Sequence, residues 1–131
     1  MTTLDVYFGD RSLPPRLVKM DTQGSEPRIF RGGARTLSHK DRDSVFIIEF
    51  WPFGMQNAGA DIDAYIDHLA NFTQRPFVID QTVARLRPTS WQELKRRVGE
   101  DLAPATEAFV DVVMVSVGSA AYYTIDEMVA D

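Results

Sequence analysis

The chain has 131 residues, a formal net charge of -5 at pH 7 and no cysteine. This length favours one domain, and the absence of cysteine excludes disulfides, thiolate catalysis and zinc–thiolate sites. The acidic balance disfavours a broad nucleic-acid or anionic-membrane surface, and no apolar run approaches membrane-spanning length, so we expect a soluble cytoplasmic protein.

The first part of the chain predicts an entry segment, a connector and a strand. Leu4 to Phe8 alternates apolar and polar residues, which predicts a short strand or extended segment. A Leu-Pro-Pro sequence at 13–15 predicts a rigid connector, because proline fixes its own φ. Arg16–Asp21 then reads as the first convincing strand, which ends at a carboxylate where open α/β sheets place their ligands.

A glycine turn and a helix are predicted after this strand. Gly24 permits positive φ or close approach, and Ser25 is expected to cap a helix that runs from Glu26 to about Leu37. Two consecutive glycines, at 32 and 33, weaken this helix. They indicate either close packing against a sheet or a break in a short helix.

The next strand is predicted at Val45 to Trp51, where the residues are apolar almost without alternation. Such a run is typical of a strand covered on both faces in a parallel sheet. Glu49 is the exception, since an unpaired carboxylate is costly to bury. A loop is expected from Pro52 to Gly59.

The remaining pattern predicts alternating helices and strands, followed by a tail. In chain order these are a helix from the Asp61 cap to about Asn71, a strand at Phe77–Ile79, a turn at Leu86–Thr89, a helix from the Ser90 capping box to about Val98, and a last strand at Phe109–Val117. Residues 118–131 are expected to form a loosely docked tail. The two histidines, His39 and His68, lie on different predicted elements, so no histidine metal site is expected.

Two motifs in this order resemble a known enzyme family. Lys19 to Glu26, KMDTQGSE, matches K-hydrophobic-D-x-[EQ]-G-x-E, and Glu49 to Pro52, EFWP, matches E-x-x-P. Together they resemble the carboxyl-terminal half of FkbM-type S-adenosylmethionine-dependent methyltransferases. Thr3-Leu4-Asp5 is similar to the T-L-D that enters this half, and the resemblance extends to about Ser116.

The resemblance implies part of a class I methyltransferase fold, which is Rossmann-like and three-layered. We expect about four main strands, mostly parallel, with the last strand antiparallel. Arg16–Asp21 and Val45–Trp51 would be the fourth and fifth strands, and Phe77–Asp80 and Phe109–Val117 the sixth and seventh. The chain would then form a single domain over residues 1–131.

The same resemblance implies a methyl-acceptor site at one edge of the sheet. Asp21 and Glu49 would be the catalytic candidates, either of which can take the proton of an acceptor hydroxyl. The candidates for substrate binding are Lys19, Gln23, Gly24, Glu26, Trp51 and Phe53. Gln23, Gly24 and Glu26 would shape the turn beside Asp21.

Structural roles remain open for the same residues. Asp21 could bond turn amides, and Glu49 could pair with Lys19 or an arginine. Lys19 could extend along an edge, while Trp51 and Phe53 could simply cover the end of the sheet.

The cofactor side of the family fold has no counterpart in the 131 residues. S-adenosylmethionine is the cofactor that the resemblance implies, yet neither G-x-G-x-x-G nor an apolar strand with a glycine-rich turn occurs. We therefore expect half of an enzyme for O-methyl transfer to a small-molecule or sugar hydroxyl, inactive alone and without tight cofactor binding.

The alternatives are a subunit of a split methyltransferase or a non-enzymatic binding or assembly module. In either, a homo-oligomer or a complementary amino-terminal half would join at the Arg16–Asp21 edge. The sequence indicates neither a nucleic-acid partner nor a membrane partner.

Overall fold

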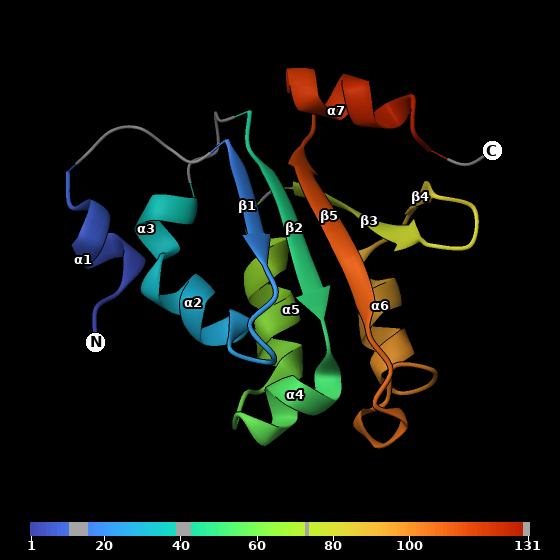
Figure 1. Ribbon diagram of the computed structural model, residues 1–131, viewed down its shortest axis with the longest axis horizontal. Coiled ribbons are helices and arrows are strands. Elements are labelled where there is room, and N and C mark those ends of the chain that lie inside the picture. Colours follow the sequence, from blue (N-terminus) through green and yellow to red (C-terminus); the bar gives the residue numbers. More distant parts are fainter. Residues whose placement is uncertain (11–15, 39–42, 73, 130–131) are drawn as a thin grey trace.

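The computed structural model describes residues 1–10, 16–38, 43–72 and 74–129, so the predicted connector at 13–15 and His39 lie outside the described residues. A five-stranded mixed sheet forms the centre, in the order β1-β2-β5-β3-β4 (Figure 1). The strands are β1 (Leu17–Met20), β2 (Val45–Phe50), β3 (Gln74–Asp80), β4 (Arg85–Pro88) and β5 (Val110–Ser116).

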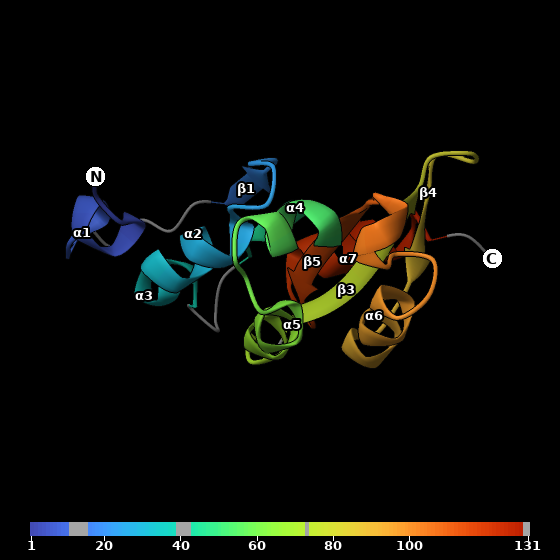
Figure 2. The same ribbon diagram turned by 90° about the horizontal axis from the view of Figure 1, so that it is seen from below.

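Helices flank this sheet unequally. They are α1 (Leu4–Phe8), α2 (Glu26–Gly32), α3 (Ala34–Leu37), α4 (Pro52–Asn57), α5 (Ile62–Ala70), α6 (Trp91–Val98) and α7 (Ala120–Asp126), with a 3-10 helix, η1 (Pro104–Thr106). Helices α5 and α6 lie together on one side of the sheet (Figure 2). Asp61 and Ser90 cap these two helices as predicted, by accepting hydrogen bonds from Ala64 N and Glu93 N.

The strand directions correct one prediction and confirm another. The pair β1–β2 is parallel, whereas β5 runs antiparallel to both β2 and β3, and β4 runs antiparallel to β3. Because β5 inserts between β2 and β3, those two similarly directed strands never pair with each other. The last strand is thus antiparallel as predicted, but the mostly parallel sheet of about four strands is wrong. The fold is an open α/β sheet, consistent with a Rossmann-like architecture.

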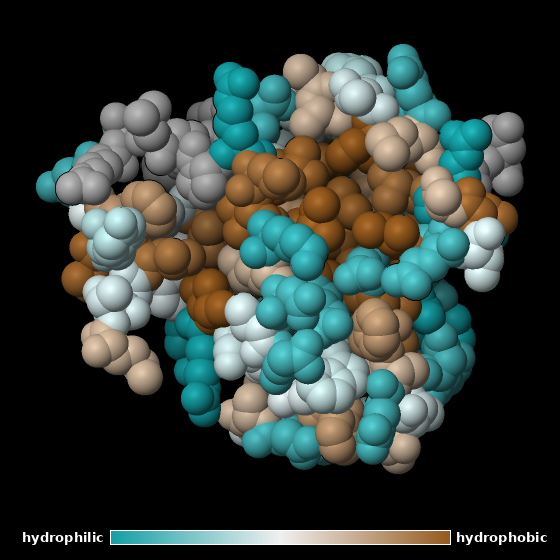
Figure 3. Space-filling model, viewed as in Figure 1, coloured by the Kyte–Doolittle hydropathy of each residue, from teal (hydrophilic) through white to brown (hydrophobic). Residues whose placement is uncertain are grey.

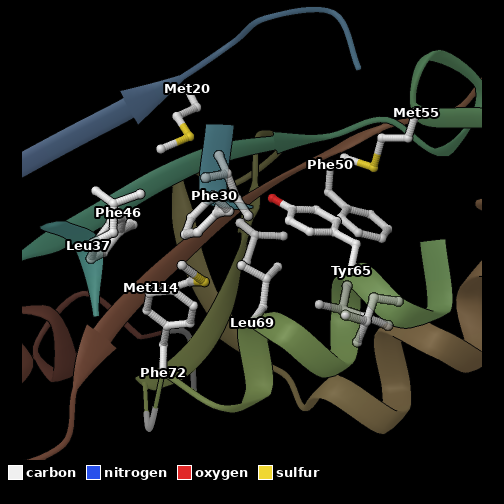
Figure 4. Close-up of a cluster of buried hydrophobic side chains, with 14 of the residues drawn as sticks. Met20, Phe30, Leu37, Phe46, Phe50, Met55, Tyr65, Leu69, Phe72 and Met114 are labelled. Atoms are coloured by element: carbon white, nitrogen blue, oxygen red, sulfur yellow. The ribbon is translucent and has the colours of Figure 1, made fainter. Parts of the chain in front are cut away.

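The main core lies between the sheet and the helices on that one side. Phe46, Ile48 and Phe50 alternate along β2 and are fully or almost fully buried, as alternate residues of a strand share a face. Several aromatic rings meet in the cluster: the ring centroids of Phe30 on α2 and Tyr65 on α5 lie 5.8 Å apart (Figure 4). This packing fixes α2 and α5 against the strand that carries Glu49.

The opposite face of the sheet is covered less completely. On β2 its apolar residues, Val45 and Ile47, are only half-buried, so the prediction of a strand covered on both faces fails among the described residues. Helix α7 covers the part of this face over β5 and β3, where Ile125 is buried. Arg75 Nη1 donates to Tyr122 Oη at 2.6 Å, which ties this helix of the tail to β3.

Three further predictions are corrected. Leu4–Phe8 is a helix, because Thr3 accepts a hydrogen bond from Val6 N and starts the turn, and a five-residue alternation is too short to specify a strand. Pro52–Asn57 is helix α4 rather than loop, since proline suits the first helical turn. Arg85–Pro88 is edge strand β4 rather than a turn, with Pro88 at its end.

Of the two alternatives for the adjacent glycines, the break in a short helix is confirmed and the packing against a sheet is wrong. The predicted helix breaks at Gly33 into α2 and α3. A Cβ on Gly33 would lie 2.9 Å from Leu4 Cδ1, so the close packing is against α1 rather than the sheet.

Candidate functional site

A buried glutamate organises the turn that follows β1. Glu26 is completely buried, and its carboxylate accepts hydrogen bonds from Thr22 N at 2.6 Å, Thr22 Oγ1 at 2.8 Å and Gly24 N at 3.0 Å. The carboxylate thus replaces the backbone partners that a tight turn lacks. Sequence analysis assigned Glu26 to this turn, and its burial places it beneath the turn rather than on a substrate-facing surface. It is Glu26, not Asp21, that bonds the turn amides.

A backbone contact holds the same turn against α4. Gly24 has φ +97°, and a Cβ on it would lie 2.3 Å from the carbonyl carbon of Gly54. Gly54 in turn lies under the ring of Trp51, where a Cβ would approach Trp51 Cε3 to 2.2 Å. Trp51 Nε1 donates to the carbonyl of Glu107 at 3.0 Å. Glycine is therefore required at both positions by close approach, and the indole ring covers the end of β2.

The polar side chains at this edge converge on one amide group. Gln23 Nε2 lies 3.1 Å from Asp21 Oδ1 and 3.4 Å from Glu49 Oε2, so it links the two predicted catalytic candidates. Lys19 Nζ lies 3.6 Å from Asp21 Oδ2, and both of these side chains are largely exposed. The structure therefore brings Lys19, Asp21, Gln23 and Glu49 together. Phe53 packs beside Trp51, with 5.5 Å between ring centroids.

The surroundings of Glu49 shift the pKa of its carboxyl group. Partial burial raises the pKa of its carboxyl above the ordinary value, and the negative charges of Asp21, Glu26 and Asp111 raise it further. Asp111 is the cross-strand partner of Glu49. Asp111 is not among the residues predicted from the sequence, although an acidic residue near the start of an antiparallel last strand must lie at the carboxyl ends of the parallel strands.

A hollow of about 370 Å³ lies beside Asp111 at the end of β3. Gln81 Nε2 donates to Asp111 Oδ2 at 3.2 Å inside it. Its lining is mixed in charge and polarity: Val78, Ile79, Asp80, Gln81, Arg87, Arg97, Phe109, Val110 and Asp111. Neither Trp51 nor Phe53 lines this hollow, so the structure separates these two candidate wall residues from it.

The described residues contain no cluster of three or more histidine, aspartate or glutamate side chains arranged to hold a metal ion. Within the same part of the chain, no helix has the length and apolar character needed to cross a membrane.

No family model, curated protein or solved structure matches the chain. The geometry at the ends of β1, β2 and β3 is therefore the feature of the molecule that bears on its function.

Proposed function

We propose that the chain is the methyl-acceptor half of an FkbM-like O-methyltransferase acting on a hydroxyl of a small molecule or sugar. The observation that carries this proposal is the Asp21–Gln23–Glu49 arrangement at the carboxyl end of two parallel strands. Open α/β sheets bind their ligands at this edge.

The residues suit proton acceptance from an alcohol. Glu49 combines partial burial with nearby carboxylates, which bring the pKa of its side chain closer to neutrality and make it a stronger base once ionised. Gln23 can hold Glu49 and Asp21 in position through its amide while its carbonyl oxygen remains available to a hydroxyl. Asp21, the more exposed carboxylate, would orient the acceptor.

The same residues do not fit the cofactor. The amides of Thr22 and Gly24, which a glycine turn could otherwise offer, already donate to Glu26. The site is also acidic, and it lacks a glycine-rich turn with free amides in the described ranges. We therefore assign no step of cofactor binding to this chain, and expect it to be inactive by itself.

Nuclear magnetic resonance tests the acceptor role without requiring turnover. Sugars and small alcohols titrated into the isotope-labelled chain should shift the amide signals of residues 21–24 and 49–51. Asp21→Asn and Glu49→Gln should weaken the shifts while Lys95→Gln, on α6, leaves them unchanged. The acceptor proposal fails if the shifts occur elsewhere or are absent across the panel.

Calorimetric titration with S-adenosylmethionine tests the assignment as a half-enzyme. We expect no tight binding to the isolated chain, because no described group fits the cofactor. Tight binding of S-adenosylmethionine to the isolated chain would overturn that assignment.

The second candidate is a subunit of a split methyltransferase or a non-enzymatic assembly module. The position of β1 at the end of the strand order favours it, because an edge strand presents backbone donors and acceptors for pairing. Under an assembly role, Glu49→Gln should leave self-association intact, because Glu49 lies on β2 rather than on the β1 edge; the acceptor role requires that the same variant weakens the amide shifts caused by alcohols.

A further inference from the structure

The outer edge of β1 borders the less covered face of the sheet. Among the described residues β1 pairs with β2 alone. Leu17 on this edge is 62% exposed, and Val45 and Ile47 beside it are half-buried. Figure 3, from the same side as Figure 1, shows apolar residues gathered over the sheet below α7.

The backbone of β1 is oriented for pairing on its outer side. Val45 N donates to the carbonyl of Arg16 at 2.8 Å, so the polar groups of Arg16 point toward β2. Backbone polar groups alternate along a strand, so those of Leu17 and Lys19 point away from β2, and the same alternation carries to Asp21. These outward groups can form a ladder with another strand.

We propose that this edge joins two copies of the chain, by antiparallel pairing of β1 with its symmetry mate about a two-fold axis at Met20. The proposal rests on the assembly role above and names its partner; it does not depend on the acceptor role, although it uses the same Lys19 and Asp21 side chains. Two-fold symmetric dimers, in which the same surface of each chain forms the contact, are the commonest soluble homo-oligomers.

Charge selects the position of the axis. The side chains of the two strands must share a face and the outward backbone groups must meet, which limits the axis to Val18, Lys19 or Met20. An axis at Val18 sets apolar Leu17 opposite the ammonium of Lys19, and an axis at Lys19 sets two ammonium groups opposite each other. An axis at Met20 sets each Lys19 opposite the other copy's Asp21, and opposite charges across a ladder are favourable.

Lys19 and Asp21 are therefore self-complementary across this edge. They already share a face, with Lys19 Nζ 3.6 Å from Asp21 Oδ2 in one copy. In the dimer each ammonium lies between two carboxylates, its own and its partner's.

Charge exchange tests the pairing directly, with sedimentation equilibrium as the measurement. The unaltered chain should reach twice its mass of 14.8 kDa as concentration rises. Lys19→Asp alone and Asp21→Lys alone each place like charges opposite one another, and should weaken dimerisation by about tenfold. The double variant Lys19→Asp/Asp21→Lys should regain dimerisation.

Mixing the two single variants shows whether each charge change acts across the interface or within its own chain. A Lys19→Asp chain and an Asp21→Lys chain should form a mixed dimer, because both cross-strand pairs become opposite in charge. Lys95→Asp, which makes the same charge change at the Asp67 ion pair, should leave dimerisation unaltered. Circular dichroism checks that each variant is folded.

Cysteine cross-linking tests the register. The chain has no cysteine, so each introduced thiol is unique. Lys19→Cys and Asp21→Cys chains should form a disulfide when mixed more readily than either does with itself. The proposal is overturned if the unaltered chain remains a monomer at its highest soluble concentration, or if the single charge variants dimerise as the unaltered chain does. It is also overturned if either cysteine variant forms a disulfide with itself more readily than the mixed pair does.

Discussion

Gly24 and Gly54 meet backbone to backbone, which joins the turn after β1 to helix α4. A Cβ on Gly24 would lie 2.3 Å from the carbonyl carbon and oxygen of Gly54, far inside van der Waals contact. The turn carries Gln23 and the helix follows β2, which carries Glu49. Together with the parallel pairing of β1 and β2, this contact sets how the two halves of the candidate site face each other.

The contact between Gly24 and Gly54 predicts that one added methyl group lowers the free energy of unfolding by an unusually large amount. Gly24→Ala should destabilise the fold by about 2–4 kcal/mol, because positive φ is strained for alanine and the added methyl meets backbone. Gly59→Ala is the matched control, since Gly59 also has positive φ, +78°, but open space around its Cβ position. It should cost only about 1 kcal/mol. Urea unfolding measures both, and equal losses would contradict the close approach as the cause.

Glu26 should be a stabilising residue of the turn. Glu26→Gln turns an acceptor of several hydrogen bonds into a group with one oxygen, and sets an NH2 against a backbone N–H or the Thr22 hydroxyl. We expect a loss of about 1–3 kcal/mol in the free energy of unfolding, because buried amides lose their partner. Glu93→Gln, which alters an exposed carboxylate on α6, should have a smaller effect. Similar losses for both would argue against a special role for Glu26.

The raised pKa of Glu49 predicts a pH dependence with a definite sign. The folded chain binds this proton more tightly than the unfolded chain, so ionisation of Glu49 opposes folding. Its unfavourable contribution is absent below the ordinary value of 4.5 and grows as pH rises through the raised value. Glu49→Gln should thus gain stability relative to the unaltered chain from acid to neutral pH, by under about 1 kcal/mol because the group is only partly buried.

Thermal unfolding of Glu49→Gln and the unaltered chain over that pH range checks the sign. The difference in melting temperature should widen toward neutral pH. A difference that is constant, or that narrows, would contradict a raised pKa for Glu49 in the folded chain.

The tail helix α7 should depend on Tyr122. Tyr122→Phe removes the acceptor of the 2.6 Å bond from Arg75, and we expect a loss of about 1 kcal/mol with faster amide exchange over residues 120–126. Tyr123→Phe is the matched control, because Tyr123 is 64% exposed, and should change little. Equal exchange rates in the two variants would show that the Arg75 contact does not hold the helix.

Local chemistry made several elements predictable. Asp61 and Ser90 are followed by helical apolar spacing, so each cap and its helix could be recognised without long-range information. The long apolar runs of β2 and β5 also identified their strands. Leu4–Phe8 and Arg85–Pro88 were misassigned because short segments take the structure that their packing favours, and neighbours distant in sequence decide that packing.

The sequence by itself determined the strand end at Asp21, the glycine turn and the acidic residue on the next strand. Only the tertiary structure decided what each does, because hydrogen bonding and burial depend on residues far along the chain. It placed Glu26 beneath the turn, brought Asp111 opposite Glu49, and inserted β5 between β2 and β3. It also left β1 paired with β2 alone among the described residues, a property that no local pattern encodes.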